Sequence, residues 1–321
     1  MRRLVVKNNP PKLYDLTTLQ REANRYYGFT AQQTLELVQS LYEKKLLTYP
    51  RTDSQFLTED MEGTARQVIS IVCRKLPLFI GLSHEPDIQR VINNAKVTDH
   101  HAIIPTVQLD TQDIGELPQS EQKILSLIGM RLLAATGEKH LYDETRITVL
   151  CEGYEFKAKG KTVVQDGWKS IEMRFRASLD GKEKDEPEQV LPDLREGTVL
   201  ESVTSSVTEH FTSPPKAFTE DTLLSAMETA GNEGFDEDTE KKGLGTPATR
   251  AGIIEKLVKG GFVERKGKSL VSTKDGNNLV CILPEQIASP SMTAQWENTL
   301  MQIERGQAEA DVFLADIAKM T

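Results

Sequence analysis

The chain has 321 residues, of which 38% are hydrophobic, 27% charged and 6% aromatic, a composition typical of a globular protein with two or three domains. Its mean hydropathy is -0.41, and no apolar run approaches the roughly 18 residues of a membrane span, which argues against an integral membrane protein. Three widely spaced cysteines, Cys73, Cys151 and Cys281, argue against a disulfide framework or a zinc ribbon and favour a reducing, cytoplasmic setting.

Charge is distributed unevenly along the chain. The formal net charge is -9, which by itself argues against a polyanionic partner. Residues 1–52 nevertheless hold nine Lys or Arg against four acidic residues, and residues 241–268 hold eight against two. Two basic segments in an acidic chain are typical of a protein that contacts nucleic acid locally, although two solvated helix faces would give the same pattern.

Hydrophobic spacing and turn residues predict a multi-domain α+β protein. Helices are expected over 17–27, from 30 onward, over 59–76, over 120–136 and after 247. Strands are expected over 146–150, 154–158, 198–200 and 203–205, with a hairpin turn at 159–161 and a second hairpin over 262–272.

One structural outline occurs twice. Residues 30–54 and residues 246–272 each read as a helix followed by extended chain and a basic turn, and they coincide with the two basic segments. A helix followed by a basic hairpin is the outline of a winged helix, which places both parts against DNA. The coincidence favours nucleic-acid contact.

The segment 49–54, Tyr-Pro-Arg-Thr-Asp-Ser, carries the most specific chemistry. The proline disfavours helix at Tyr49, which is therefore expected on extended chain. A tyrosine phenolate is a usable nucleophile, and Arg51 projects to the same side of an extended chain, where it can neutralise charge on a phosphate under attack. Thr52 and Ser54 can hydrogen-bond phosphate oxygens. A phosphotyrosine product would keep the energy of the phosphodiester, so a strand could be resealed without ATP.

Two further segments offer groups that bind phosphate. In the run Asp99-His100-His101, an imidazolium can bind phosphate or donate a proton near neutral pH. Neighbouring side chains on a strand point to opposite faces, so one histidine at most is expected to serve the site. In the segment 243–250, Gly-Leu-Gly-Thr-Pro-Ala-Thr-Arg, glycines precede a helix N-terminus, which attracts anions.

Five motifs in order resemble the type IA DNA topoisomerases, and among them the bacterial topoisomerase III branch. They lie at residues 13–23, 47–54, 99–106, 214–220 and 243–249. The resemblance covers nearly the whole chain.

The resemblance implies a role for each matching side chain. Tyr49 would attack single-stranded DNA to give a 5′-phosphotyrosyl link, Arg51 would stabilise the scissile phosphate, and His100 would contact a phosphate or assist protonation. The remaining DNA-binding side chains would be Thr52, Ser54, Gln20, His101, Thr246, Thr249 and Arg250.

The resemblance also implies a toroidal arrangement of two winged-helix-like helical domains and a β-rich hinge domain. Residues 1–11 would be the end of the hinge domain, 12–137 the helical domain with the tyrosine, 138–215 the hinge domain, and 216–321 a winged-helix-like DNA-binding domain.

The chain departs from the family pattern in one respect. It has no counterpart of the N-terminal Toprim domain, whose acidic residues hold Mg²⁺; Asp236-Glu237-Asp238 has Asp-x-Asp spacing but lies in a polar loop. We therefore expect a fragment without metal ligands of its own that relaxes DNA weakly or not at all. Mg²⁺, but not ATP, is expected for the full-length enzyme.

The expected partner is single-stranded DNA at the cytoplasmic nucleoid, with a helicase as a candidate protein partner and no membrane. The alternative from another class is a non-catalytic winged-helix DNA-binding protein. In that case Tyr49→Phe would leave function intact, and duplex DNA would bind at least as well as single strands.

Overall fold

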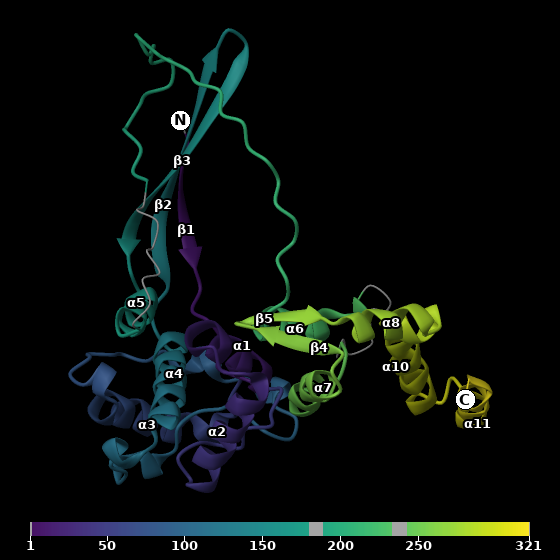
Figure 1. The fold of residues 1–321 in the computed structure, drawn as a ribbon. Coiled ribbons are helices and arrows are strands. Elements are labelled where there is room, and N and C mark those ends of the chain that lie inside the picture. Colours follow the sequence, from purple (N-terminus) through teal and green to yellow (C-terminus); the bar gives the residue numbers. More distant parts are fainter. Residues whose placement is uncertain (1, 180–188, 233–242, 321) are drawn as a thin grey trace. The chain divides into compact units, whose positions relative to one another are not determined.

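The computed structural model describes residues 2–179, 189–232 and 243–320 (Figure 1). It is an α+β structure that divides into two compact units. Unit 1 comprises residues 1–14, 41–49 and 54–215, and unit 2 comprises residues 15–40, 50–53 and 216–321. Within the described ranges, no helix is both long enough and apolar enough to cross a membrane.

After strand β1, the regular elements follow one another in a helical, then β-rich, then helical order. The α-helices are α1 (Leu16–Tyr27), α2 (Ala31–Glu43), α3 (Glu62–Lys75), α4 (Gln119–Ala135), α5 (Lys169–Ala177), α6 (Glu220–Thr229), α7 (Pro247–Lys259), α8 (Lys274–Ile282), α9 (Glu285–Ala288), α10 (Ser291–Glu304) and α11 (Ala310–Met320). The strands are β1 (Arg2–Asn8), β2 (His140–Cys151), β3 (Tyr154–Gln165), β4 (Val263–Lys266) and β5 (Ser269–Ser272). The helices expected over 17–27, from 30, over 59–76, over 120–136 and after 247 are confirmed.

The helical part of unit 1 is built around α4. This helix carries apolar side chains on all its faces, and it packs against both α3 and α5. A helix that is apolar all round is buried. Its side chains with at most 1% exposure are those of Ile124, Leu125, Leu127, Ile128, Leu132, Leu133, Ala134 and Ala135. They form the core on which the loops between α2 and α4 rest.

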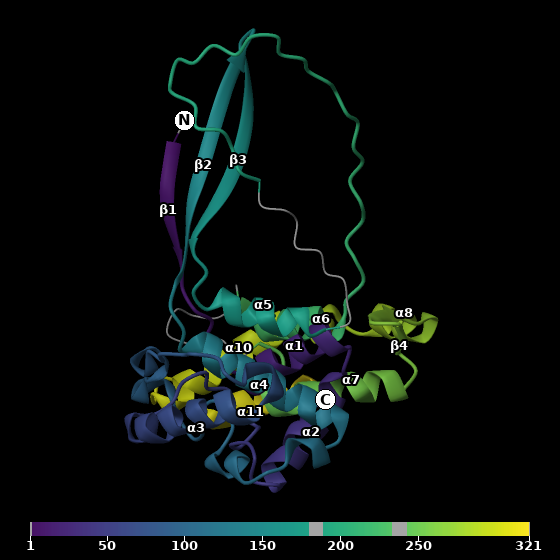
Figure 2. The ribbon, with the colours of Figure 1, turned by 90° about the vertical axis from the view of Figure 1, so that its left-hand side faces the viewer.

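The sheet of unit 1 is an antiparallel ribbon in the order β1-β2-β3. Figure 2 shows β2 and β3 extending well beyond the end of β1. Cys151 pairs with Tyr154 across a two-residue turn, in which Glu152 has φ 49° and Gly153 φ 83°. Positive φ at both central residues is the geometry that suits a tight hairpin.

The hairpin turn expected at 159–161 is wrong, because these residues lie inside β3. A Cβ on Gly160 would lie 2.6 Å from Cγ of Leu191 and 2.7 Å from the carbonyl oxygen of Gln189. The amide of Lys161 also donates to that carbonyl at 3.0 Å. The glycine therefore marks a close approach of a returning chain, which is another reason for glycine within a strand.

The strands expected over 198–200 and 203–205 are also wrong. The described chain from 189 to 218 contains no strand, and Val199 and Val203 are 83% and 60% exposed. β-branched residues favour a strand only where a neighbouring strand completes the hydrogen bonds. Among the described residues, nothing pairs with this segment as a strand.

Unit 2 has its own small core. Helix α1 packs against α6 and α7, and α7 packs against β4. The buried residues of this core are Ala31, Leu224, Met227, Ala251, Ile254 and Leu270. The hairpin expected over 262–272 is confirmed as β4 and β5, in which Lys266 pairs with Ser269.

Truncation of one core side chain tests this packing. Ile254 is 2% exposed, whereas its neighbour Ile253 on the same helix is 37% exposed. Ile254→Ala should lower the free energy of opening of α7 by about 2–5 kcal/mol, because it removes buried methyl groups and leaves a cavity. Amide hydrogen exchange of peptides from α6 and α7 measures this. Ile253→Ala is the matched control, and equal effects of the two substitutions would contradict the packing described here.

Candidate functional site

Tyr49 lies on extended chain just after α2, as the sequence predicts. Leu47 forms an isolated β-bridge with Pro105, and the amide of Thr48 donates to the carbonyl of Ile104 at 3.0 Å. The Thr48 hydroxyl donates to the carbonyl of Ala102 at 3.1 Å and accepts from the amide of Ile104 at 3.0 Å. The segment before Tyr49 is therefore fixed to residues more than fifty positions later in the chain.

This attachment brings Tyr49 and His100 together. Their ring centroids are 4.2 Å apart with an interplanar angle of 41°, and the ring of Tyr42 meets Tyr49 edge-on at 5.5 Å. Tyr49 is half-buried and His100 is exposed. An exposed imidazole against a phenol can exchange protons and bind an anion near neutral pH.

His101, the second histidine of the pair, bonds to the backbone. Nδ1 of His101 lies 2.9 Å from the carbonyl oxygen of Ala102. Because a carbonyl can only accept, Nδ1 carries the proton and donates. This bond commits one ring nitrogen of His101 to the backbone, and its predicted DNA contact stays a prediction.

The rest of the segment 49–54 is divided between the two units. Arg51 is exposed in unit 2, where the carbonyl of Thr52 accepts from the amide of Leu16 at 3.1 Å. Ser54 belongs to unit 1, and its hydroxyl donates to the carbonyl of Lys96 at 2.8 Å. The side chains of Thr52 and Ser54 are 2% and 4% exposed. Their predicted phosphate contacts, and that of Arg51, stay predictions.

The other predicted DNA-binding side chains lie in unit 2. The fully buried amide of Gln20 donates to the carbonyl of Ala31 at 3.0 Å and holds α1 to the start of α2. Thr246 and Thr249 form a capping box at the start of α7, in which the Thr249 hydroxyl accepts from the amide of Thr246 at 2.9 Å. Both threonines are surface residues at this helix N-terminus.

Arg250 points into unit 2 and is 2% exposed. Its guanidinium donates to the carbonyls of Leu244 and Gly245, each at 3.1 Å, and to the Thr17 hydroxyl at 3.0 Å. Burial lowers the pKa of this guanidinium. Arg250 therefore ties the glycine loop to α1, and its predicted DNA contact stays a prediction.

Several residues of the two basic segments are neutralised within their own unit. In unit 2, Asp221 pairs with Arg21 at 2.9 Å and with Arg25 at 3.0 Å, and Glu220 pairs with Arg265 at 2.7 Å. In unit 1, Lys44 pairs with Glu121, again a residue far away in sequence. The local excess of positive charge in the sequence therefore overstates the charge offered to a partner.

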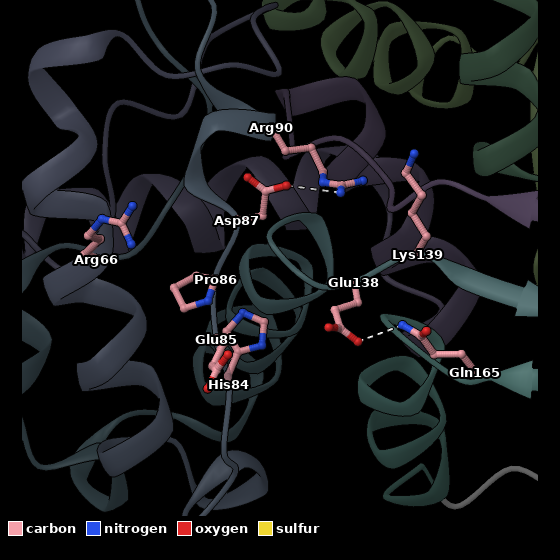
Figure 3. Close-up of a pocket in the computed structure, with 9 residues that line it drawn as sticks. All are labelled: Arg66, His84, Glu85, Pro86, Asp87, Arg90, Glu138, Lys139 and Gln165. Atoms are coloured by element: carbon pink, nitrogen blue, oxygen red, sulfur yellow. Dashed lines mark hydrogen bonds and ion pairs between the residues drawn. The ribbon is translucent and has the colours of Figure 1, made fainter.

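A cavity of about 620 Å³, lined mostly by charged residues, lies in unit 1 where β2 and β3 meet the helical part. Its lining residues are Arg66, His84, Glu85, Pro86, Asp87, Arg90, Glu138, Lys139 and Gln165. Figure 3 shows Arg90 facing Asp87 and Glu138 facing Gln165, bonds of 3.2 and 2.7 Å. Sequence reasoning missed this cavity, because its residues come from separate segments and form no motif.

His84 is the titratable ring of this cavity. Its Nε2 lies 2.9 Å from the Thr136 hydroxyl, which itself donates to the carbonyl of Leu132 at 2.9 Å. Nε2 of His84 is therefore the donor. Burial lowers the pKa of His84, because the charged ring loses solvation.

Candidate metal ligands do not cluster in the described part of the chain. Among residues 2–179, 189–232 and 243–320, no three His, Cys, Asp or Glu side chains are grouped as metal ligands. Asp236 and Asp238, with their Asp-x-Asp spacing, lie outside the described residues. The described side chains therefore give no group to which a Mg²⁺ ion can be assigned.

Comparison with known proteins gives one consistent family. The family described as "DNA topoisomerase" matches residues 1–315. DNA topoisomerase 3 of Bacillus subtilis is 39% identical over 99% of the chain, and that of Bacillus licheniformis is 37% identical over 99%. Full-length topoisomerase I from Thermotoga maritima is structurally similar, with a TM-score of 0.72 and 26% identity over 99% of the chain.

The chain spans less than half of those curated relatives. It covers 45% of the length of each Bacillus protein and 50% of the Thermotoga maritima chain.

The partly buried His84 should give unit 1 a pH-dependent stability. Its pKa is lowered below 6.5 in the folded state, so on acidification the unfolded state takes up its proton first. The unfolded state thus binds more protons in that window, and the free energy of unfolding should fall as the pH is lowered below about 6.5. Urea unfolding followed by the fluorescence of Trp168 measures it.

His84→Gln should reduce this dependence, since glutamine can still donate to Thr136 but does not titrate. The matched control is His210→Gln, at an exposed histidine of unit 1. An unchanged pH dependence in His84→Gln would contradict the assignment.

Proposed function

The chain belongs to the DNA topoisomerase family, and from this premise we propose that it acts within a type IA enzyme that cuts and reseals single-stranded DNA through Tyr49. The observation that carries the proposal is the contact between Tyr49 and His100, whose ring centroids are 4.2 Å apart. A nucleophile and a proton carrier are the pair of groups that this reaction needs.

The proposed cleavage is a transesterification. The phenolic oxygen of Tyr49 forms a bond to phosphorus, and the bond between phosphorus and the 3′ oxygen breaks. The phenol loses its proton and the 3′ oxygen gains one, with His100 as the carrier. One phosphodiester is exchanged for another, so resealing is the reverse step and needs no ATP.

Other side chains would serve binding and charge neutralisation. The exposed Arg51 would stabilise negative charge that develops on the scissile phosphate. Thr246 and Thr249, at the N-terminus of α7, would meet strand phosphates. Helix α7 followed by the β4–β5 hairpin supports a winged-helix-like DNA-binding region within unit 2.

The same proposal includes a toroidal arrangement of the full-length enzyme, with the β-rich region as its hinge. It also includes a requirement for Mg²⁺. Mg²⁺ is proposed as the cofactor of the full-length enzyme, and none of the described side chains is assigned to it. The chain alone should therefore relax supercoiled DNA weakly or not at all. Action on chromosomal DNA at the nucleoid, with a helicase as a candidate partner, also belongs to this proposal.

The nucleophile is tested in a chimera in which this chain replaces the matching region of Bacillus subtilis DNA topoisomerase 3. Tyr49→Phe should abolish both plasmid relaxation and the covalent DNA adduct, because phenylalanine has no oxygen to form the phosphotyrosyl bond. Denaturation of cleavage reactions, followed by mass spectrometry of the DNA-linked peptide, measures the adduct.

Tyr42→Phe is the matched control, since the Tyr42 ring contacts Tyr49 and is 37% exposed. It should leave adduct formation nearly intact. Full activity in Tyr49→Phe, together with duplex binding at least as tight as single-strand binding, would favour a non-catalytic winged-helix DNA-binding protein.

A further inference from the structure

Two lysines from separate segments of unit 1 converge on one aromatic ring. Nζ of Lys12 lies 5.6 Å from the centroid of Phe56, and Nζ of Lys96 lies 5.2 Å from it. Lys12 precedes the buried residues Leu13 and Tyr14, and Lys96 ends the short 3-10 helix η4 (Asn94–Lys96). Both lysines are exposed. We call Lys12 and Lys96 the lysine pair on Phe56.

Hydrogen bonds connect this group to the Tyr49 segment. The carbonyl of Phe56 accepts from the amide of Ala102 at 2.9 Å, and the carbonyl of Ala102 accepts from the Thr48 hydroxyl at 3.1 Å. The carbonyl of Lys96 accepts from the Ser54 hydroxyl at 2.8 Å. The lysine pair is therefore built on the same backbone frame that places Tyr49 against His100.

The charges of the pair are available to a partner. Other basic residues of unit 1, such as Lys44 and Arg74, form ion pairs with Glu121 and Asp110. Within the part of the chain that the structure describes, neither Lys12 nor Lys96 has an acidic partner. Two like charges at one ring repel each other, and the attraction of the ring face for each ammonium group offsets part of that repulsion.

A polyanion that contacts both ammonium groups is attracted by both charges. We propose that Lys12 and Lys96 bind the phosphodiester backbone of the single DNA strand that Tyr49 cleaves, with Phe56 as the residue that positions them. This inference rests on the proposed function. The ammonium groups at Phe56 form point-charge contacts, so binding should be independent of base sequence.

The test uses the complete chain and a fluorescein-labelled oligothymidylate. Each single-strand phosphate contact contributes about -0.7 to the slope of log affinity against log salt. The double substitution Lys12→Gln with Lys96→Gln should therefore make the slope shallower by about 1.4 and weaken binding about 25-fold at roughly 0.1 M salt. Fluorescence anisotropy titrations over a range of salt concentrations measure both quantities.

Lys157→Gln is the matched control, because Lys157 is an exposed lysine of the same unit on the β2–β3 ribbon. It should change neither affinity nor slope. Phe56→Leu should weaken binding by less than the double substitution and keep most of the slope, since the charges remain. Both lysines are exposed, so circular dichroism should show the double variant folded.

If the double variant has the same affinity and salt slope as the parent chain, the inference is overturned. The proposed function would still stand in that case, provided that the Tyr49→Phe chimera forms no adduct. Failure of the parent chain to bind the oligonucleotide at any salt concentration would overturn both. A loss of binding equal in Lys157→Gln and in the double variant would also overturn the inference, because it would show a general charge effect.

Discussion

The arrangement of the reactive segment depends on one threonine hydroxyl. The Thr48 hydroxyl donates to the carbonyl of Ala102 and accepts from the amide of Ile104, at 3.1 and 3.0 Å. A single hydroxyl thus satisfies two backbone groups of a distant segment, which offsets part of the entropy lost when the two segments are ordered together. This attachment holds the chain before Tyr49 beside the segment that carries His100. The amide of Ala102 in that segment also donates to the carbonyl of Phe56 at 2.9 Å.

Ion pairing divides the basic residues into those that hold the fold together and those whose charge is available to a polyanion. Arg21, Arg25 and Arg265 are held by Asp221 and Glu220 inside unit 2, so they fix α1 and the β4–β5 hairpin to the start of α6. Lys12 and Lys96 are left for a polyanion. An acidic chain with a net charge of -9 can therefore offer local positive charge where its lysines have no acidic partner among the described residues.

The sequence predicts those features whose signals are local. The helices and the β4–β5 hairpin follow from spacing, capping and turn residues, and the extended chain at Tyr49 follows from the proline after it. The turn predicted at Gly160 is wrong, because a glycine permits both a turn and a close approach of another chain segment. The valines near 199 and 203 needed a pairing partner that local sequence does not supply. Other features are likewise non-local, so no sequence motif predicts them: the pairing of Arg21 with Asp221, the burial of Arg250 and the cavity at His84.

The most direct test is the rate of adduct formation by Thr48→Val in the chimera with Bacillus subtilis DNA topoisomerase 3. Valine keeps the shape but loses both hydrogen bonds to the segment after His101. At about 1.4 kcal/mol for the lost positioning, the rate of adduct formation should fall about tenfold with little change in DNA affinity. Thr48→Ser, which keeps the hydroxyl, should retain most of the rate. Adduct formation by Thr48→Val at the parent rate would contradict the claim that this attachment positions the nucleophile.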